Sequence, residues 1–435
     1  MNNKQPTTNG NPKGLAATAD IWRSLRNRNY RLFFIGQGVS MIGTWMQMAS
    51  VSWAIYRLTN SPVYLGINGF ASLLPSFFAT PFAGVMIDRW DRRRTVITTQ
   101  VLLMIQAVIL AAFFLTGHVS VWHIITLSFF GGMINAFDMP ARQALVFNMV
   151  KKENVSNAIA LNSVTFNGAR LIGPSLAGIL IATSGESICF LINALSFIAV
   201  LAALWAIRIG PAKNGERHNA VMQDLKDGLR YASGSATIRL LLILLAVFSL
   251  MGLSYPVLMP VFARVILRGD SRTFGFLMTA IGVGALTGAF YLAARTNIRG
   301  LGTASAVALT TFSFGIFAFS FSRTIWLSLI LIAFAGFGVM VFLASINTIL
   351  QTVVEDDKRG RIMGLYTMAF MGMTPFGNLL SGAVAGAIGA VHTLQLNGSL
   401  CLLAAIVLIK NLPAIEQSIA PHTAEKITPE PVGTQ

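Results

Sequence analysis

The sequence predicts an all-α membrane protein with twelve transmembrane helices in two bundles of six. Hydrophobic residues make up 54% of the 435 residues, and charged residues only 11%. The apolar residues form repeated runs, each long enough to cross about 30 Å of hydrocarbon as a helix. The basic residues behind the net charge of +16 are divided among the segments between these runs. A nucleic-acid partner is therefore not expected, because it requires basic residues gathered on one solvated face.

Twelve apolar spans can be placed along the chain, with polar segments between them. They cover residues 32–57, 62–88, 95–117, 120–148, 156–184 and 187–208 in the first half, and 238–265, 272–294, 300–321, 325–353, 360–388 and 391–410 in the second. The resulting units are a cytoplasmic tail (1–28), a first six-helix bundle (29–208), a cytoplasmic linker with a short amphipathic helix (209–237), a second bundle (238–411) and a disordered cytoplasmic tail (412–435).

Lys and Arg residues are distributed unequally between the two sides of this topology. With the N-terminus inside, 26 of the 32 basic residues fall on the inner side, and five fall in outer loops. Cytoplasmic loops of membrane proteins carry an excess of Lys and Arg. Both termini are therefore expected in the cytoplasm.

The two halves also share sequence at an offset of 204 residues. Residues 149–185 match residues 353–389 at eight of 37 positions without a gap. The glycine matches are Gly168/Gly372, Gly173/Gly377, Gly178/Gly382 and Gly185/Gly389. Such a match between halves of the same orientation predicts a parallel duplication.

The most strongly charged stretch of the chain lies between spans two and three. Residues 88–94 hold six charges in seven positions. Because charges this dense are costly in hydrocarbon, we expect them in a short aqueous loop between two membrane helices. With a glycine that precedes it, this loop carries a recognisable signature at Gly84, Asp88, Arg89, Arg92 and Arg93.

This signature resembles the loop between the second and third helices of the major facilitator superfamily. Residues 43–47, 157–163 and 359–365 are similar to the drug-exporter branch that includes the enterobactin exporter. Asp91 departs from the glycine that the superfamily usually has at its position. The resemblance covers residues 30–410 and implies the major facilitator fold, in which two six-helix halves rock around a central site.

The resemblance also implies a conformational latch at the inner membrane face. In the family, the loop aspartate caps a helix of the other half and a loop arginine pairs with an acid on the fourth helix, which holds the outward-open state. Carried over, Asp88 would face the start of span eleven near Arg361, and Arg92 would reach Asp138. A carboxylate at a helix N-terminus gains about 0.3–1 kcal/mol. The alternative is that the loop arginines only mark the cytoplasmic side or face anionic lipid.

Of the sixteen acidic residues, Asp138 alone falls well within a span. An intramembrane carboxylate is costly unless it is paired, so Asp138 is a candidate site of proton coupling. The alternative is a permanent ion pair with Arg142, which lies four residues later on the same helix face. Arg170 in span five is expected to face the interior, where it either binds an anionic part of the substrate or pairs with Asp138.

Span five carries small residues and a proline at Gly168, Gly173, Pro174 and Gly178. Small residues let helices approach closely, and a proline removes one backbone hydrogen bond, so this segment can pack tightly and bend. The pattern is similar to the antiporter motif of exporters in this superfamily. It favours export over uptake.

Polar side chains within spans are expected to line a central cavity, because lipid cannot satisfy them. The candidates are Trp45, Gln47, Asn68, Asn135, Asn162, Asn167, Asn347, Gln351 and Asn378. A cavity of amides, aromatic rings and methionines suits amphiphilic organic molecules better than sugars or inorganic ions. The alternative for each residue is that it only holds helices together.

Several chemistries are not supported by the sequence. It contains no phosphate-binding loop, no His/Cys cluster with metal-ligand spacing, and no nucleophile and base at a catalytic spacing. We therefore expect no enzyme activity, cofactor or metal.

The resulting hypothesis is a monomeric secondary transporter, surrounded by lipid, in the inner membrane of a bacterium. It would export a hydrophobic or amphiphilic small molecule, of the drug or siderophore type, in exchange for protons. An uptake carrier or a lysolipid flippase of the same fold is the alternative.

Overall fold

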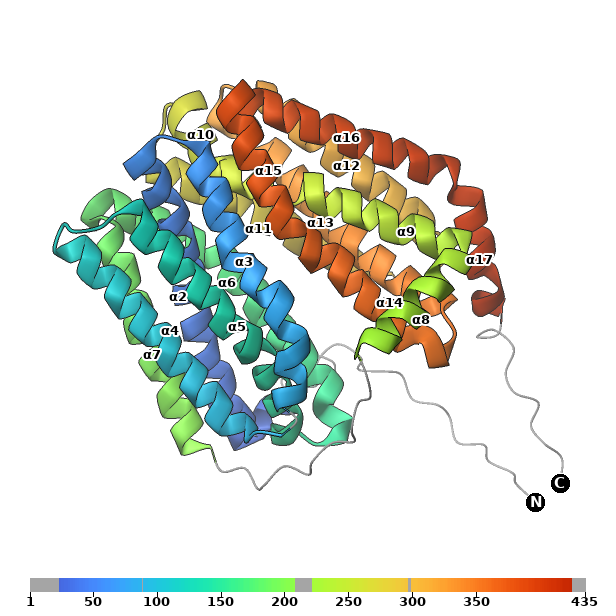
Figure 1. The fold of residues 1–435 in the computed structure, drawn as a ribbon, viewed down its shortest axis with the longest axis horizontal. Helices are drawn as coiled ribbons and strands as arrows, with labels where there is room; N and C mark the ends of the chain where they lie inside the picture. Colours follow the sequence, from blue (N-terminus) through green and yellow to red (C-terminus); the bar gives the residue numbers. More distant parts are fainter. Residues whose placement is uncertain (1–22, 88, 208–220, 296–298, 425–435) are drawn as a thin grey trace, which may run out of the picture.

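The computed structural model describes residues 23–87, 89–207, 221–295 and 299–424. Figure 1 shows two helical bundles, the first coloured from blue to green and the second from yellow-green to red. Ten of the described helical segments are long and apolar enough to cross a membrane. The all-helical prediction is therefore confirmed for the described residues, whereas the number of twelve crossings stays a prediction.

The first bundle follows the predicted spans closely. Its helices are α2 (Arg28–Thr59), α3 (Pro62–Ile87), α4 (Arg92–Leu115), α5 (Val121–Met149), α6 (Val155–Ser184) and α7 (Glu186–Ala206). Short 3₁₀ turns, η1 (Arg23–Arg26) and η2 (Lys152–Asn154), precede α2 and α6. The Asn27 side chain caps α2, and that of Asp91 caps α4 by accepting a hydrogen bond of 2.7 Å from the Arg94 amide. The departure from the signature at Asp91 thus supplies a helix cap.

Two segments of the second bundle are interrupted rather than regular. The predicted seventh span consists of α9 (Ala236–Val247), a π-helix η3 (Phe248–Gly252), a 3₁₀ turn η4 (Tyr255–Leu258), α10 (Met259–Val261) and a π-helix η5 (Phe262–Ile266). The eleventh consists of α14 (Asp356–Thr367), a π-helix η6 (Met368–Gly372) and α15 (Met373–Ile388). Pro256, Pro260 and Pro375 lie in or next to these interruptions, and a proline lacks the N–H that a regular helix needs.

The other helices of the second bundle are regular. They are α11 (Ser271–Ala293), α12 (Leu301–Phe321), α13 (Ile325–Val353) and α16 (Ala390–Lys410). Gly185 ends α6 at φ 79° and Gly389 ends α15 at φ 84°, a conformation that favours glycine. These glycines are equivalent in the repeat, so both halves end the same helix in the same way.

The linker contains the short helix expected there, α8 (Val221–Gly234), which packs against α14. The tail expected to be disordered from residue 412 begins instead with a helix, α17 (Leu412–Ala424). Ile415 and Ile419 of α17 are buried, and Glu416 accepts a hydrogen bond of 3.3 Å from the Thr303 amide at the start of α12. The polar composition of the tail conceals an apolar face with helical spacing.

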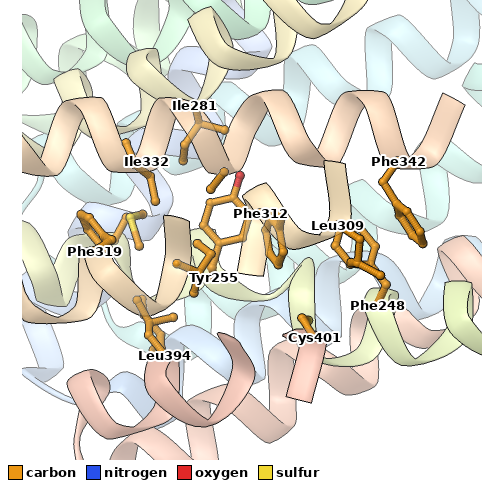
Figure 2. Packing of buried hydrophobic residues seen from close by; sticks show 14 of the residues in the cluster. Phe248, Tyr255, Ile281, Leu309, Phe312, Phe319, Ile332, Phe342, Leu394 and Cys401 are labelled. Carbon is orange, nitrogen blue, oxygen red and sulfur yellow. The ribbon is translucent and has the colours of Figure 1, made fainter. Parts of the chain in front are cut away.

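Aromatic side chains fill the core of the second bundle (Figure 2). The Phe248 ring centroid lies 4.9 Å from that of Phe312 and 4.7 Å from that of Phe342. The same hydrophobic cluster continues into the first bundle, where Trp53 of α2 stacks on Phe274 of α11 at 5.9 Å. One apolar core therefore joins the two halves.

Candidate transport site

The two halves meet at two close helix crossings. In the first, α3 of the first half crosses α15 of the second half. A Cβ added to Gly382 would lie 2.6 Å from the Gly66 Cα, and one added to Gly66 would lie 2.7 Å from the Asn378 carbonyl oxygen. A side chain at either glycine would therefore push the backbones apart.

The second crossing joins α6 of the first half to α11 of the second half. A Cβ added to Gly178 would lie 2.6 Å from the Ser271 carbonyl oxygen and 3.1 Å from the Gly275 Cα. The Ser271 hydroxyl donates to the Gly178 carbonyl (2.9 Å), and the hydroxyl groups of Ser175 and Thr279 lie 2.8 Å apart. Hydroxyl groups thus hold together the backbones that glycine allows to approach.

The antiporter-type motif contributes to this crossing and to packing inside the first half. Gly178 makes the crossing itself, and Pro174 presents its carbonyl 2.7 Å from the Cβ position of Gly275. Gly173 faces α2 instead, where an added Cβ would lie 2.6 Å from the Trp45 Cβ. A Cβ at Gly168 would meet nothing within 4 Å. Three of the four motif residues are therefore packing residues, and Gly168 is not.

Both crossings lie toward one end of the bundles. We call this end the closed face. It contains the first residues of α3 and α11, Pro62 and Ser271, and the last residues of α6 and α15, Ser184 and Ile388. At the opposite end, the open face, a Cβ added to Gly84 of α3 or to Gly360 or Gly364 of α14 would meet nothing within 4 Å. Figure 1 shows the two bundles diverging away from the closed face.

The charged loop between α3 and α4 lies at the open face. Asp88 lies outside the described residues, and Arg89 is exposed. Arg93 donates from Nε to the Leu204 carbonyl (2.8 Å) and from Nη2 to the Trp205 carbonyl (3.1 Å) at the end of α7. Arg93 therefore satisfies carbonyl groups that the helix end leaves without partners.

Arg361, near which Asp88 was expected to lie, is in the first turns of α14. One of its guanidinium nitrogens lies 3.7 Å from a carboxylate oxygen of Asp227 on the linker helix α8. Asp356 and Asp357 also lie in the first turn of α14. A hydrogen bond from Lys358 keeps the pKa of Asp357 below its usual value. The helix start that the latch would cap thus already carries carboxylates.

Asp138 is fully buried in α5 and has three polar neighbours. Its Oδ1 accepts hydrogen bonds from Thr99 (2.6 Å) and Gln100 (2.8 Å) of α4. Its Oδ2 lies 2.6 Å from Arg142 Nε, an ion pair in which the N–H does not point at the oxygen. The expected contact with Arg92 is not made, and Arg142 is the ion-pair partner of Asp138. Arg92 donates to Asn148 instead, at 3.0 Å.

Arg170 of α6 faces the interior without the partner proposed for it. The carboxylate of Asp138 is occupied as described above, and Nε and Nη2 of Arg170 are buried without a hydrogen-bond partner. Tyr255 of η4, in the other half, lies within electrostatic reach of the guanidinium. Of the two roles expected for Arg170, pairing with Asp138 is therefore not the one that this conformation uses.

Gln47 belongs to a chain of amide hydrogen bonds that crosses the first bundle. Asn193 of α7 donates to the Gln47 Oε1 (2.8 Å), and Gln47 donates to the Gln106 Oε1 of α4 (2.8 Å). Gln106 in turn donates to the Leu127 carbonyl of α5 (3.2 Å). The amide of Gln47 thus connects helices, and it is not free to bind a ligand in this conformation.

One of the other cavity candidates lies at the contact between the halves. Asn378 of α15 packs against Gly69 of α3, where an added Cβ would lie 2.9 Å from its side chain. The neighbouring Asn68 is buried, and its Oδ1 has no hydrogen-bond partner. Trp45 packs edge-on against Phe166 of α6 at 5.5 Å.

The remaining candidates make contacts within their own half. Asn135 and Asn167 each donate to a backbone carbonyl four residues earlier in the same helix. Gln351 donates to the Asn347 Oδ1 on α13 at 2.6 Å. Asn162 is half-buried between α2 and α6, beside Tyr30. A role in substrate contact stays a prediction for all five.

Residues 19–432 of the chain match the family model of the transmembrane secretion effectors, which belong to the major facilitator superfamily. The chain belongs to this family. Its members are membrane transporters rather than enzymes, and the chain is a multi-pass protein of the bacterial inner membrane. The predicted superfamily and exporter branch are thereby confirmed.

Several bacterial transporters are similar to this chain over most of their length. The staphyloferrin A transporter of Staphylococcus aureus is 26% identical over 371 residues, which cover 85% of this chain and 92% of the relative. The multidrug efflux pump Tap of Mycolicibacterium fortuitum is 25% identical, and the match covers 86% of this chain and 93% of Tap. The enterobactin exporter EntS of Citrobacter koseri is 25% identical, with 84% and 86% covered.

Solved structures share the fold of this transporter. A mutant of the nucleoside transporter NupG superposes with a TM-score of 0.68 at 14% identity, covering 88% of this chain and 99% of its own. A bacterial homologue of the human lysosomal transporter Spinster, in an inward-facing and unoccupied conformation, superposes with a TM-score of 0.62 at 13% identity. The match covers 92% of this chain and 95% of the homologue. At these identities the likeness establishes the fold alone.

One ion pair of this transporter was not expected from the sequence. Arg57 at the end of α2 donates from Nε (2.6 Å) and Nη2 (3.2 Å) to the buried carboxylate of Glu186 at the start of α7. It lies at the closed face and joins two helices of the first half. The available signal was that both charged residues lie at the edges of predicted spans, but the sequence does not pair them.

Proposed function

We propose that this transporter exports a hydrophobic or amphiphilic small molecule across the cytoplasmic membrane by alternating access, in exchange for protons. The observation that carries the proposal is the restriction of both glycine crossings to one face of the molecule. Helices packed at one end and separated at the other are the arrangement that one state of an alternating-access cycle requires.

The direction in which the pathway opens follows from the predicted topology. The excess of Lys and Arg assigns the open face to the cytoplasm and the closed face to the outside. The conformation then corresponds to a cytoplasm-open state. In the opposite state the crossings α3–α15 and α6–α11 would separate, and the open face would close.

The latch fits this assignment as a device of the outward-open state. In a cytoplasm-open state its contacts are expected to be apart, and the hydrogen bond of Arg92 to Asn148, rather than an ion pair with Asp138, is consistent with that. Closing the open face would bring the start of α4 toward the start of α14. The carboxylate of Asp227 would then have to share Arg361 or release it.

Amphiphilic organic molecules are the proposed substrates. Relatives of similar length are named as a transporter of staphyloferrin A, a multidrug efflux pump and an enterobactin exporter. Exposed apolar side chains such as Met48, Phe166 and Met371 on α2, α6 and η6 supply adaptable surface of the kind such molecules bind. The antiporter-type motif in α6 favours export.

Proton coupling is proposed at the pair of Asp138 and Arg142. Protonation of Asp138 would remove the charge that balances Arg142 and would weaken the contacts between α4 and α5. Titration of one buried carboxylate could in this way be linked to helix movement. The alternative, a purely structural pair, is separated from proton coupling by the measurement below.

The test is transport in everted membrane vesicles, with ethidium, erythromycin and enterobactin as probes. We expect at least one probe to accumulate inside, faster when the lumen is acidic, and to be released by nigericin. Accumulation that is independent of the gradient would remove the proton part of the proposal. Accumulation in right-side-out vesicles alone would identify an uptake carrier, and movement of a lysolipid alone would identify a flippase.

A further inference from the structure

Arg170 lies at the contact between the two halves, level with the middle of α6. One turn away, Gly173 packs against Trp45 of α2, and the adjacent Leu171 lies 3.2 Å from the Cβ position of Gly282 of α11. The Thr279 hydroxyl also donates to the Leu171 carbonyl at 3.3 Å. The backbone on either side of Arg170 is therefore packed against a helix of its own half and a helix of the other half.

The guanidinium of Arg170 has no anionic partner in the described structure. Its Nε and Nη2 are buried and make no hydrogen bond, while the side chain as a whole stays partly exposed. A cation inside the membrane is costly unless an anion or several hydrogen bonds satisfy it. The partly exposed side leaves a route by which a ligand can supply that anion.

Within the described membrane-spanning helices, no carboxylate is left to fill this role. Asp138 is paired with Arg142, and Glu186 is paired with Arg57. The segments 236–269, 271–354 and 358–415 of the second half contain no Asp or Glu at all. The charge of Arg170 therefore has to be balanced by something that the spans themselves do not provide.

Tyr255 supplies a second polar group from the opposite half. It lies in the irregular turn η4 and packs its ring against Phe312 at 5.8 Å. Figure 2 shows its hydroxyl pointing toward Ile281 of α11. Ile281 precedes Gly282, the residue that contacts Leu171 next to Arg170, and the phenol lies within electrostatic reach of the Arg170 guanidinium.

We propose that Arg170 and Tyr255 form a subsite for an anionic group, such as a carboxylate, on the molecule that this protein transports. The guanidinium would form charge-assisted hydrogen bonds to the anion, and the phenol would donate one more from the other half. The proposal rests on the proposed function because it takes the ligand to be the transported molecule. It narrows the substrate class from amphiphiles in general to amphiphilic anions and zwitterions.

The test is binding of two dyes that differ in one charge. Tetramethylrhodamine carries a free carboxylate, and its methyl ester has the same ring system without that charge. Fluorescence titration of the purified full-length protein in lipid nanodiscs measures both affinities. We expect the free acid to bind at least about tenfold more tightly than the ester, since a hydrogen bond to a charged group is lost with the ester.

Three variants separate this subsite from general dye binding. Arg170→Gln should remove the preference for the free acid, and Tyr255→Phe should reduce it by a few-fold. Arg239→Gln changes an exposed arginine of α9 and should leave the preference unchanged. No preference in the wild-type protein, or an unchanged preference in Arg170→Gln, would overturn the proposal.

The thermal stability of the ligand-free protein provides a readout that needs no dye. If Arg170 lacks a partner, Arg170→Gln should unfold at the same temperature as the wild-type protein or higher, because it removes an unpaired buried charge. A lower unfolding temperature would mean that Arg170 holds the fold together, and the proposal would then be wrong. Nanodisc binding does not depend on the direction of transport, so an anion preference can hold even if vesicle assays reject export.

Discussion

Gly178 of α6 and Gly382 of α15, 204 residues apart, make equivalent contacts in the two halves of the molecule. A Cβ at Gly178 would lie 2.6 Å from the Ser271 carbonyl oxygen, and one at Gly382 would lie 2.6 Å from the Gly66 Cα. Each glycine belongs to the fifth segment of its half and meets the second segment of the other half. The internal repeat therefore builds a matched pair of crossings that close one face.

Enlarging one of these glycines should impair transport. In Gly382→Ala the added methyl group would meet backbone atoms of Gly66 and Pro62, which cannot move aside as a side chain can. Overpacking of this kind costs about 1–3 kcal/mol. We expect probe transport in vesicles to fall at least about tenfold as the closed face becomes harder to form.

Gly364→Ala is the matched control for this change. It lies in α14 of the same predicted span, and an added Cβ there meets nothing within 4 Å. Transport should be close to that of the wild-type protein. Equal rates in the two alanine variants would contradict the role of the crossing.

A disulfide across the second crossing should stop the cycle. The hydroxyl groups of Ser175 and Thr279 lie 2.8 Å apart, which brings their Cβ atoms near disulfide distance. In a protein lacking Cys189 and Cys401, the pair Ser175→Cys and Thr279→Cys should cross-link under oxidation and abolish transport. Reduction should restore it, and transport by the fully oxidised protein would rule out separation of α6 and α11.

Asp138→Asn should destabilise the protein because it leaves Arg142 without its counterion. Removing one partner of a buried ion pair costs about 3–5 kcal/mol of stability. Because Arg142 is partly exposed, we expect a loss at the low end of this range. Adding Arg142→Gln should recover part of the unfolding temperature. If the double variant is folded but transports independently of the pH gradient, Asp138 is the coupling site; if coupling persists, the pair is structural.

Asp88→Asn should slow turnover without affecting folding. The latch contact is expected only in the outward-open state, so its loss changes the cycle rather than the stability of the described conformation. Asp227→Asn is the comparison, since it removes an exposed ion pair at 3.7 Å worth at most about 1 kcal/mol. Vesicle transport and thermal unfolding should be measured for both; wild-type transport in Asp88→Asn would exclude the latch.

Glu186→Gln should lower the unfolding temperature of the first half. The carboxylate of Glu186 is buried, although Arg57 is partly exposed, and we expect a loss of about 1 kcal/mol. Asp357→Asn, which removes an exposed pair with Lys358, should have a smaller effect. Equal losses of unfolding temperature in the two variants would mean that burial of Glu186 does not make its ion pair with Arg57 more stabilising.

Helix positions were well predicted because the membrane constrains them. Hydrocarbon demands about twenty apolar residues per crossing, so apolar runs reveal where helices lie even without an alignment. The prediction was weaker where a helix lies outside the spans or is interrupted. The tail helix α17 depends on a narrow apolar face at Ile415 and Ile419, and π-helical turns such as η3 have no simple sequence signal.

Side-chain partners could not be predicted in the same way. Gln47 was expected in a cavity, yet its hydrogen bonds to Asn193 and Gln106 depend on how three helices pack. The partner of Asp138 within its own helix, Arg142, was foreseeable because spacing along a helix fixes which residues are neighbours. For residues on different helices, no fixed spacing in the sequence indicates which side chains will be neighbours.

The sequence by itself determined the membrane class, the exporter branch and the repeat, and it predicts an inner position for the charged loop, because these follow from hydropathy, charge distribution and local motifs. The tertiary structure decided which face is closed, which glycines form the crossings, and that Arg170 is left without a carboxylate. These features depend on the relative position of two halves that are linked by a polar segment. Only packing across the interface determines that position.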